Sequence, residues 1–388
     1  MKPSAPIPYG KQYISDEDID AVVKVLRSDF LTQGPAIAEF ERNFADYIGV
    51  KYAVAVSNAT AGLHLAAIAL NVKPGDKILS TPITFVASTN CILYCGGEIE
   101  FVDIDPETYL IDLDKLENKL KNTPKGTYKG IIPVDFAGYP LDMERMHTIA
   151  KEYGLWVIED ACHAPGAYFI DSKGNKQFSG NAAFSEIGIF SFHPVKHIAS
   201  GEGGMITTNE EELFQKLFML RTHGITKDPN FLIDNHGVWY YEMQMLGYNY
   251  RITDFQAALG NSQLKRADDG LIRRNEIAEK FNRAFRSTKI KTPKSPADGG
   301  FHAYHLYIIQ VDDRKGLYDY LRENNVFAQV LYIPVYAMPY YKNTGYKEGE
   351  CPVAEEYYRH CLALPMYPTL TEEEQDWVIN CVLQFIDW

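Results

Sequence analysis

The chain has 388 residues, of which 46% are hydrophobic and 23% are charged, a globular composition with enough length for a large core and a second, smaller domain. The net charge is -13, and the lysines and arginines are scattered along the chain, which excludes a basic surface for nucleic acid. Any anion that the protein binds must therefore be held by a local site.

The cysteines and the apolar runs indicate the compartment in which we expect the protein. The six cysteines show no paired CxxC spacing and lie in or beside apolar runs, where small thiols are buried. The first residues lack an apolar signal core, and no stretch approaches the roughly 18 uninterrupted apolar residues of a membrane span. We expect a cytoplasmic protein without a membrane, nucleic-acid or metal partner.

From residue 53 onward, short apolar β-rich runs alternate with helical patterns, a rhythm typical of a mostly parallel sheet with helices on both faces. Residues 60–70 and 141–153 have the 3.6-residue apolar spacing of crossover helices, and Gly154 suits a left-handed cap after the second. The pattern predicts an α/β fold with seven strands, expected at residues 53–58, 77–81, 99–104, 130–135, 155–160, 187–192 and 204–209.

The chain changes character after Pro293. The segments 302–311 and 327–336 together with a closing helix, opened by Thr371 with Glu374 three residues later, predict a small α+β domain. The stretch KTPKSPADGG at 291–300 is expected to be a surface connector. We expect residues 1–265 to form a large domain that includes the N-terminal segment, and residues 266–388 to form the small one.

Ligands of open α/β sheets bind beyond the carboxyl ends of the strands, so the residues that follow each run are candidates for a site. SNATA, at residues 57–61, turns into a helix whose free N–H groups suit a phosphate, although for this motif alone an ordinary helix cap is the favoured explanation. Phe85 follows the second run and could lie flat on a ring, although most phenylalanines belong to the core.

Two later runs end in charged groups. Asp160 closes LWVIED, where burial favours an ionised carboxylate only beside a cation such as a protonated pyridine nitrogen; a capping role is the alternative. His163, just beyond, could stack on or hydrogen-bond to the same ligand. Lys196 follows IGIFSF in a segment with few charges, where its pKa can fall enough for attack on an aldehyde, although most lysines are solvated. A phosphate anchor, an acid and an amine at one sheet edge predict a pyridoxal-phosphate site.

These motifs resemble the sugar-nucleotide aminotransferases of the DegT type. The resemblance covers nearly the whole chain and is carried by LTQGP, SNATAGLHLA, TPITFVAS, IEDACHAPGA, FSFHPVKHIASGEGG, GYNYRITDFQAALG and CLALPMYPTLTEEE. It implies the aspartate-aminotransferase type I fold. It also implies pyridoxal 5'-phosphate as cofactor, with pyridoxamine phosphate as the form that carries the amino group between two half-reactions.

The resemblance assigns the catalytic roles. Lys196 would bind the cofactor covalently and shuttle protons, Asp160 would pair with the pyridine nitrogen, and His163 would neighbour the phenolic oxygen. Phe85 would stack on the ring. Relatives that dehydrate their substrate have histidine in place of the lysine, so Lys196 favours amino transfer.

The resemblance also implies how the phosphate is held and how the protein assembles. Thr60, Ala61 and Ser191 would bind the cofactor phosphate. Asn249, in GYNYR, would reach the same phosphate from the other subunit. A homodimer with shared active sites is therefore implied.

Two stretches point to a substrate class within the family. FSFHPVKHI and residues 236–251 most resemble enzymes that use L-glutamate to aminate C4 of a UDP-linked 4-keto-6-deoxy-N-acetylhexosamine in pseudaminic acid biosynthesis. Bacillosamine-type and 4-amino-arabinose-type enzymes share much of this pattern. A non-catalytic sugar-nucleotide-binding regulator and an enzyme of non-nucleotide cyclitols or keto acids remain alternatives, and the aromatic residues 239–241 favour a large polar substrate with a base.

Overall fold

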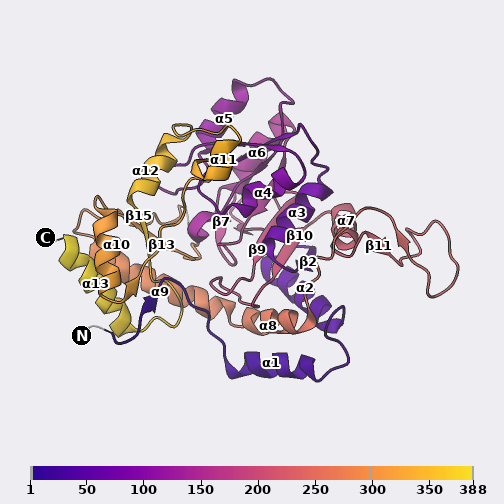
Figure 1. Ribbon diagram of the computed structural model, residues 1–388, viewed down its shortest axis with the longest axis horizontal. Helices are drawn as coiled ribbons and strands as arrows, with labels where there is room; N and C mark the ends of the chain where they lie inside the picture. The colour runs from indigo at the N-terminus through magenta and orange to yellow at the C-terminus, as the bar shows by residue number, and fades with distance from the viewer. Residues whose placement is uncertain (1–2, 298, 387–388) are drawn as a thin grey trace.

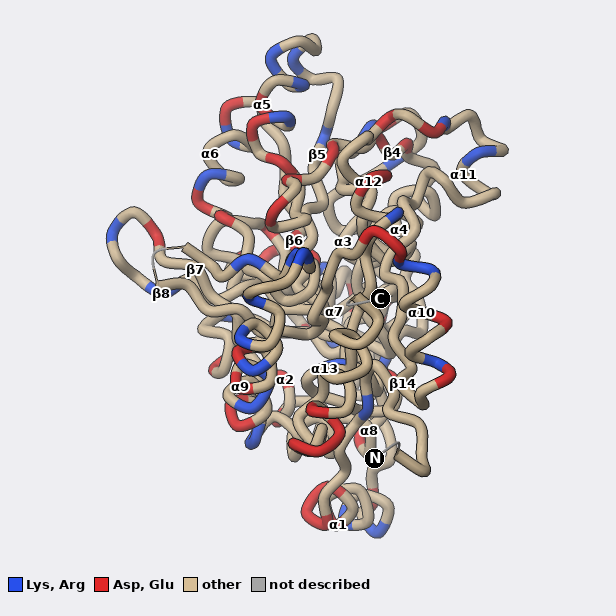
Figure 2. Tube along the Cα trace, turned by 90° about the vertical axis from the view of Figure 1, so that its left-hand side faces the viewer, with Lys and Arg blue, Asp and Glu red and all other residues tan. Residues whose placement is uncertain are grey.

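The computed structural model describes residues 3–297 and 299–386. Asp298, within the predicted connector, and residues 1–2 and 387–388, at the ends of the two predicted domains, lie outside the described residues. In the part that is described, no helix is both long and apolar enough to cross a bilayer. Figure 2 shows basic and acidic residues interspersed along the trace.

A seven-stranded sheet occupies the centre of the larger part of the molecule (Figure 1), with strand order β2-β10-β9-β6-β5-β3-β4. Strand β10 is antiparallel to β2 and β9, and the other neighbours are parallel. The predicted mostly parallel α/β sheet is therefore confirmed. Its strands are β2 (Tyr52–Val56), β3 (Lys77–Ser80), β4 (Glu98–Phe101), β5 (Tyr128–Ile132), β6 (Trp156–Asp160), β9 (Ile187–Ser191) and β10 (Gly204–Thr208).

The strands are apolar throughout because both faces of the sheet are covered. Along β2, Val54 and Val56 face a core that includes α3, whereas Ala53 and Ala55 face a second core that includes Phe44 of α2. The alternation follows from the two-residue period of a strand. The helices are α1 (Asp16–Leu26), α2 (Pro35–Ile48), α3 (Ala59–Ala69), α4 (Ala87–Tyr94), α5 (Leu113–Lys121), α6 (Met143–Tyr153), α7 (Glu211–Arg221), α8 (Asp254–Leu264), α9 (Ala267–Phe285), α10 (Arg314–Glu323), α11 (Pro339–Asn343), α12 (Pro352–His360) and α13 (Glu372–Ile386).

Both predicted crossover helices form, as α3 and α6, and α6 ends at Gly154, which adopts the expected left-handed conformation with φ 69°. The closing helix α13 also begins as predicted. The backbone N–H of Thr371 donates to the Glu374 carboxylate, and the N–H of Glu374 donates to the Thr371 hydroxyl.

The C-terminal residues form a core of their own, but with less strand than the sequence pattern suggests. Strand β13 (Tyr307–Gln310) pairs antiparallel with β15 (Cys361–Leu364). In the apolar segment 327–336, only Phe327 lies in a strand, β14 (Val326–Phe327), which pairs with β1 (Ile7–Pro8) near the N-terminus. Ile7 thus packs in the C-terminal core. The division at residue 265 stays a prediction.

Two short strand pairs and two 3-10 turns complete the description of the chain. Strands β7 (Tyr168–Ile170) and β8 (Lys176–Phe178) form one hairpin, and β11 (Ile225–Thr226) pairs with β12 (Glu242–Met243) at the base of a long loop that projects from the body in Figure 1. Single turns of 3-10 helix lie at Phe136–Gly138 and Val335–Ala337.

Candidate active site

A pocket of about 660 Å³ lies where strands β6 and β9 end and α3 begins. Six of the eight site residues expected from the sequence line it. They are Thr60, Phe85, Asp160, His163, Ser191 and Lys196. The structure therefore brings together groups from Thr60 to Lys196, which are far apart in the sequence. They meet at the sheet edge where the α/β topology places ligands.

Asp160 is the last residue of β6 and is only 5% exposed. Its Oδ2 accepts a hydrogen bond of 2.6 Å from the Ser88 hydroxyl, and its Oδ1 accepts one of 3.2 Å from the backbone N–H of Cys162. These two hydrogen bonds fix the orientation of the buried carboxylate at the end of β6.

His163 is buried, and its protonation state follows from its contacts. The backbone N–H of Ala137 donates to Nδ1 at 3.2 Å, so the ring proton must sit on Nε2. Burial, followed by the nearby Lys196 and His197, holds the pKa of His163 well below its ordinary range. His163 is therefore a neutral donor, able to give a hydrogen bond through Nε2 to an oxygen.

Lys196 lies in a turn just after β9, where its N–H donates to the carbonyl of His193. Burial lowers the pKa of the Lys196 amine to about 8, against the opposing attraction of Cys162 and Asp160. About a tenth of the amine is then unprotonated at pH 7, far more than for a solvated lysine. Nε2 of His305 lies within hydrogen-bond distance of Nζ, at 3.4 Å.

The start of α3 forms the other end of the pocket. Asn58 caps the helix by accepting from the N–H of Ala61 at 2.8 Å, so this N–H is already used, and Ala61 does not line the pocket. Thr60 and Ser191 do line it, together with Ala59. Asn58 thus forms the helix cap that the sequence offered as one explanation of this motif. The helix dipole favours an anion here.

Two predicted residues lie at the edge of the pocket or away from it. Phe85 is 58% exposed, and its ring centroid is 6.3 Å from that of Tyr332. Asn249 is exposed, forms a bridge with Thr222, and does not line the pocket of its own chain.

The sequence interpretation missed four lining or contacting groups. Ser88 and Tyr332 touch the site through tertiary folding alone, and Tyr9 reaches it from the N-terminal segment. His305 is different, because it lies in the apolar run HAYHLYIIQV, where a polar ring is conspicuous. That run could have marked it as a buried functional histidine.

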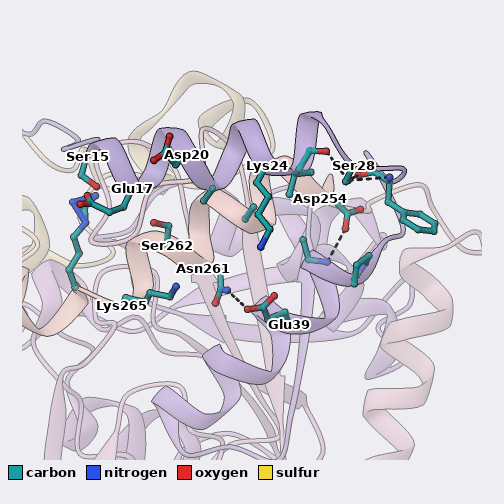
Figure 3. A pocket seen from close by; sticks show the side chains of 17 residues that line it. Ser15, Glu17, Asp20, Lys24, Ser28, Glu39, Asp254, Asn261, Ser262 and Lys265 are labelled. Carbon is teal, nitrogen blue, oxygen red and sulfur yellow. Dashed lines mark hydrogen bonds between the residues drawn. The ribbon is translucent and has the colours of Figure 1, made fainter.

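A second pocket, of about 690 Å³, lies between α1, α2 and α8 (Figure 3). Its polar groups mainly bind one another: Asn261 donates to Glu39, and Asp254 accepts from the N–H groups of Gly34 and Ala36. None of the residues that line it lies at the end of a strand. We therefore place the active site at the first pocket.

The first pocket fits pyridoxal phosphate. It offers a buried amine of lowered pKa, a buried carboxylate and a helix N-terminus, which are the groups that this cofactor needs. The fold and the site together define a PLP-dependent sugar aminotransferase. The chain belongs to the DegT/DnrJ/EryC1/StrS aminotransferase family, whose model matches residues 12–383. The family, fold and cofactor expected from the sequence are confirmed.

Similar proteins cover the chain almost completely. The spore coat polysaccharide biosynthesis protein SpsC of Bacillus subtilis is 39% identical, over 98% of this chain and 97% of that protein. The UDP-4-amino-4,6-dideoxy-N-acetyl-beta-L-altrosamine transaminase of Campylobacter jejuni is 35% identical, over 98% of each. The structure of Helicobacter pylori PseC, an aminotransferase involved in the biosynthesis of pseudoaminic acid, matches with a TM-score of 0.88 at 29% identity, over 98% of this chain and 99% of that one.

Proposed function

We propose that this aminotransferase moves an amino group from L-glutamate to C4 of a UDP-linked 4-keto-6-deoxy-N-acetylhexosamine, giving UDP-4-amino-4,6-dideoxy-N-acetyl-β-L-altrosamine. The observation that carries the proposal is the buried Lys196 amine in one pocket with the Asp160 carboxylate. The choice of substrate is supported by the names of the Campylobacter jejuni relative and the Helicobacter pylori structure.

Four side chains of the pocket have a part in this proposal. Lys196 would bind the cofactor covalently through Nζ, Asp160 would keep the pyridine nitrogen protonated, and His163 would donate from Nε2 to the phenolic oxygen. When bound, the cofactor supplies an electron sink that stabilises negative charge on the substrate carbon. Phe85, which is exposed and lines the pocket, would cover one face of the ring.

The phosphate of the cofactor would lie at the start of α3. Thr60 and Ser191 line this end of the pocket, and Ala61 belongs to the same helical turn. Asn249 of a second copy would complete the phosphate site, since Asn249 is exposed and outside its own pocket. We therefore propose a homodimer with shared active sites.

Proton transfer is the chemical task of Lys196 in both half-reactions. Its unprotonated Nζ would take the proton from the α-carbon of glutamate, and its protonated form would return one to C4 of the sugar on a single face. A base of pKa about 8 is matched to this task, because it is readily protonated and deprotonated near neutral pH.

The decisive test is a substrate panel. The purified enzyme is incubated with L-glutamate and a set of UDP- and dTDP-linked 4-keto-sugars, and the products are identified by NMR. The proposal expects amination of the UDP-linked 4-keto-6-deoxy-N-acetylhexosamine at C4, with the configuration at C4 that gives the β-L-altro product. A product of bacillosamine or 4-amino-arabinose type, or turnover only of dTDP-sugars, would replace this substrate assignment.

A further inference from the structure

His305 makes the one side-chain contact to the Lys196 amine that the described residues provide, with Nε2 at 3.4 Å from Nζ. Its ring is only 4% exposed and packs on that of His163, with ring centroids 4.3 Å apart. His305 comes from the C-terminal third of the chain, just before β13. It therefore meets Lys196 from a segment that is distant in the sequence.

The turn that carries His305 is held firmly. The buried Arg274 of α9 donates to the carbonyl oxygens of Tyr304, at 3.0 Å, and Met366, at 2.9 Å. Nδ1 of His302 accepts from the N–H of Tyr304 at 2.9 Å, and the two rings stack 3.9 Å apart. A group held by so many fixed contacts is preorganised toward its target.

Backbone hydrogen bonds join the turn that carries His305 to the residues that orient His163. The N–H of Ala303 donates to the carbonyl of Gly138, and the N–H of Leu306 donates to that of Ala137. Ala137 in turn donates its own N–H to Nδ1 of His163. The 3-10 turn at Phe136–Gly138 thus positions His163 and His305 as one unit.

The charge of His305 follows from its surroundings. Burial, followed by the neighbouring titratable groups Lys196, His163, His197 and Arg274, holds the pKa of His305 well below its ordinary range, so the ring is neutral. Asp160 and Cys162 also act on Lys196, and both favour its protonated form. His305 is the residue whose side chain forms a hydrogen bond with Nζ.

The neutral ring carries one proton, and its position decides what His305 does. Nδ1 is buried and has no hydrogen-bond partner among the described residues, so a proton there would leave an unsatisfied N–H donor. A proton on Nε2 instead points at Lys196. A donor in this place can pair only with the lone pair of an unprotonated amine.

We propose that His305 is a positioning residue that donates a hydrogen bond from Nε2 to Nζ of Lys196 and so holds this amine in its unprotonated, nucleophilic form before the cofactor is attached. The inference rests on the proposed role of Lys196. It explains how the amine stays reactive although the Asp160 carboxylate in the same pocket favours its protonation.

The test measures the Lys196 amine directly in the cofactor-free protein. Competitive labelling with acetic anhydride across pH 6 to 11, read by mass spectrometry of the Lys196 peptide, gives the apparent pKa of the amine. His305→Phe keeps the ring volume and removes the donor, so we expect this pKa to rise by about one pH unit, a tenfold loss of unprotonated amine below the pKa. His305→Gln, which restores an N–H donor, should bring it back toward the native value.

His193→Phe is the matched control, because His193 lines the same pocket but its side chain is exposed and makes no bond to Nζ. It should leave the labelling curve in place. An unchanged or lowered pKa in His305→Phe would overturn the proposal, since it would mean that Nε2 accepts from an ammonium group or makes no bond.

A second measurement needs no variant. The protein has ten histidines, so the ring nitrogens of a ¹⁵N-histidine sample can be assigned and the tautomer of His305 read by NMR. A proton on Nε2 supports the proposal, and a proton on Nδ1 refutes it. A failure of the proposed function can be distinguished from a failure of this proposal. In that case borohydride would fix the cofactor on a lysine other than Lys196.

Discussion

The hydroxyl of Ser88 donates a hydrogen bond of 2.6 Å to Oδ2 of Asp160, linking the first turn of α4 to the end of β6. Ser88 also lies 2.7 Å from the hydroxyl of Thr84. Because the Ser88 proton is committed to Asp160, Thr84 must be the donor in that second bond. This chain of hydrogen bonds from Thr84 through Ser88 to Asp160 orients the carboxylate.

Replacing Asp160 tests whether this carboxylate acts on the cofactor. Asp160→Asn preserves the size of the side chain but removes its charge, so the variant should still bind pyridoxal phosphate while both half-reactions slow by about 100-fold. Single-turnover absorbance changes with glutamate, and then with the keto-sugar, measure the two halves separately. Unchanged rates would remove Asp160 from the mechanism.

Ser88→Ala should have a smaller effect than Asp160→Asn on the same reaction. It leaves the charge in place and removes one of the two hydrogen bonds to the carboxylate, so its effect should be in the same direction and about tenfold smaller than that of Asp160→Asn. An effect as large as that of Asp160→Asn would mean that Ser88 does more than orient the carboxylate.

The parts of the site that lie at strand ends could be predicted from the sequence. Asp160 and Ser191 each close an apolar run, and Lys196 follows one, so the parallel topology alone places them at one edge. The seven strands were predicted for the same reason, because a sheet covered on both faces requires uninterrupted apolar runs.

The remainder depends on contacts between distant segments, which no local pattern records. Ser88 meets Asp160 only because β3 and β6 flank β5 in the sheet. His305 meets Lys196 only because Arg274 of α9 fixes the turn before β13. The segment 327–336 forms less strand than its apolar pattern predicts, because the residues after β14 line the active site and the C-terminal core without pairing as a strand.

Lys196→Ala should abolish covalent cofactor binding. The native protein is expected to be yellow, and borohydride should fix the cofactor on the peptide that contains Lys196, because this amine has a pKa of only about 8. The alanine variant should retain at most dissociable cofactor and show no amino transfer. Peptide mapping after reduction is the measurement, and a fixed adduct on another lysine in the variant would contradict the assignment.

The buried carboxyl pair of Asp135 and Glu159 should make the stability depend on pH. Burial raises the pKa of Asp135 to about 6, and burial together with Asp135 raises the pKa of Glu159 well above its ordinary range. The folded protein therefore binds protons that the unfolded chain has released, so stability is greatest below about pH 4 for this pair and falls as the pH rises through 6. For Asp135 alone the loss is about 3 kcal/mol.

Glu159→Gln should weaken this dependence, since it removes one titrating group and offers Asp135 a neutral amide. Urea unfolding at pH 5 and pH 8 measures the effect, and the difference between the two free energies of unfolding should be smaller in the variant. Glu373→Gln, on the exposed first turn of α13, is the control and should leave the difference unchanged. An equal pH dependence in Glu159→Gln and the native protein would rule out the pair as its source.

Gly138 should not tolerate a side chain. Its φ is 94°, and a Cβ there would lie 2.8 Å from the carbonyl oxygen of His163 and 3.0 Å from the backbone nitrogen of His305. Gly138→Ala should therefore lower the free energy of unfolding by about 1–3 kcal/mol and raise the pKa of Lys196 by moving His305 away. Gly174→Ala is the matched control, because Gly174 has a φ of 83° but no atom near its Cβ position, so it shares the backbone strain alone.

The shared active site predicts that two defective subunits can repair each other. Asn249 is exposed and does not line its own pocket, whereas Lys196 does, so in a shared site the two come from different chains. Lys196→Ala and Asn249→Ala homodimers should each be impaired. After subunit exchange at equal amounts, half of the dimers are mixed and each holds one intact site, so about a quarter of the native activity should return.

Mixing Lys196→Ala with the Lys196→Ala/Asn249→Ala double variant is the control, because no combination of those chains contains an intact lysine. If Asn249 serves only its own chain, both mixtures stay inactive, and a lack of rescue with exchange verified by mass-tagged subunits would exclude the shared site.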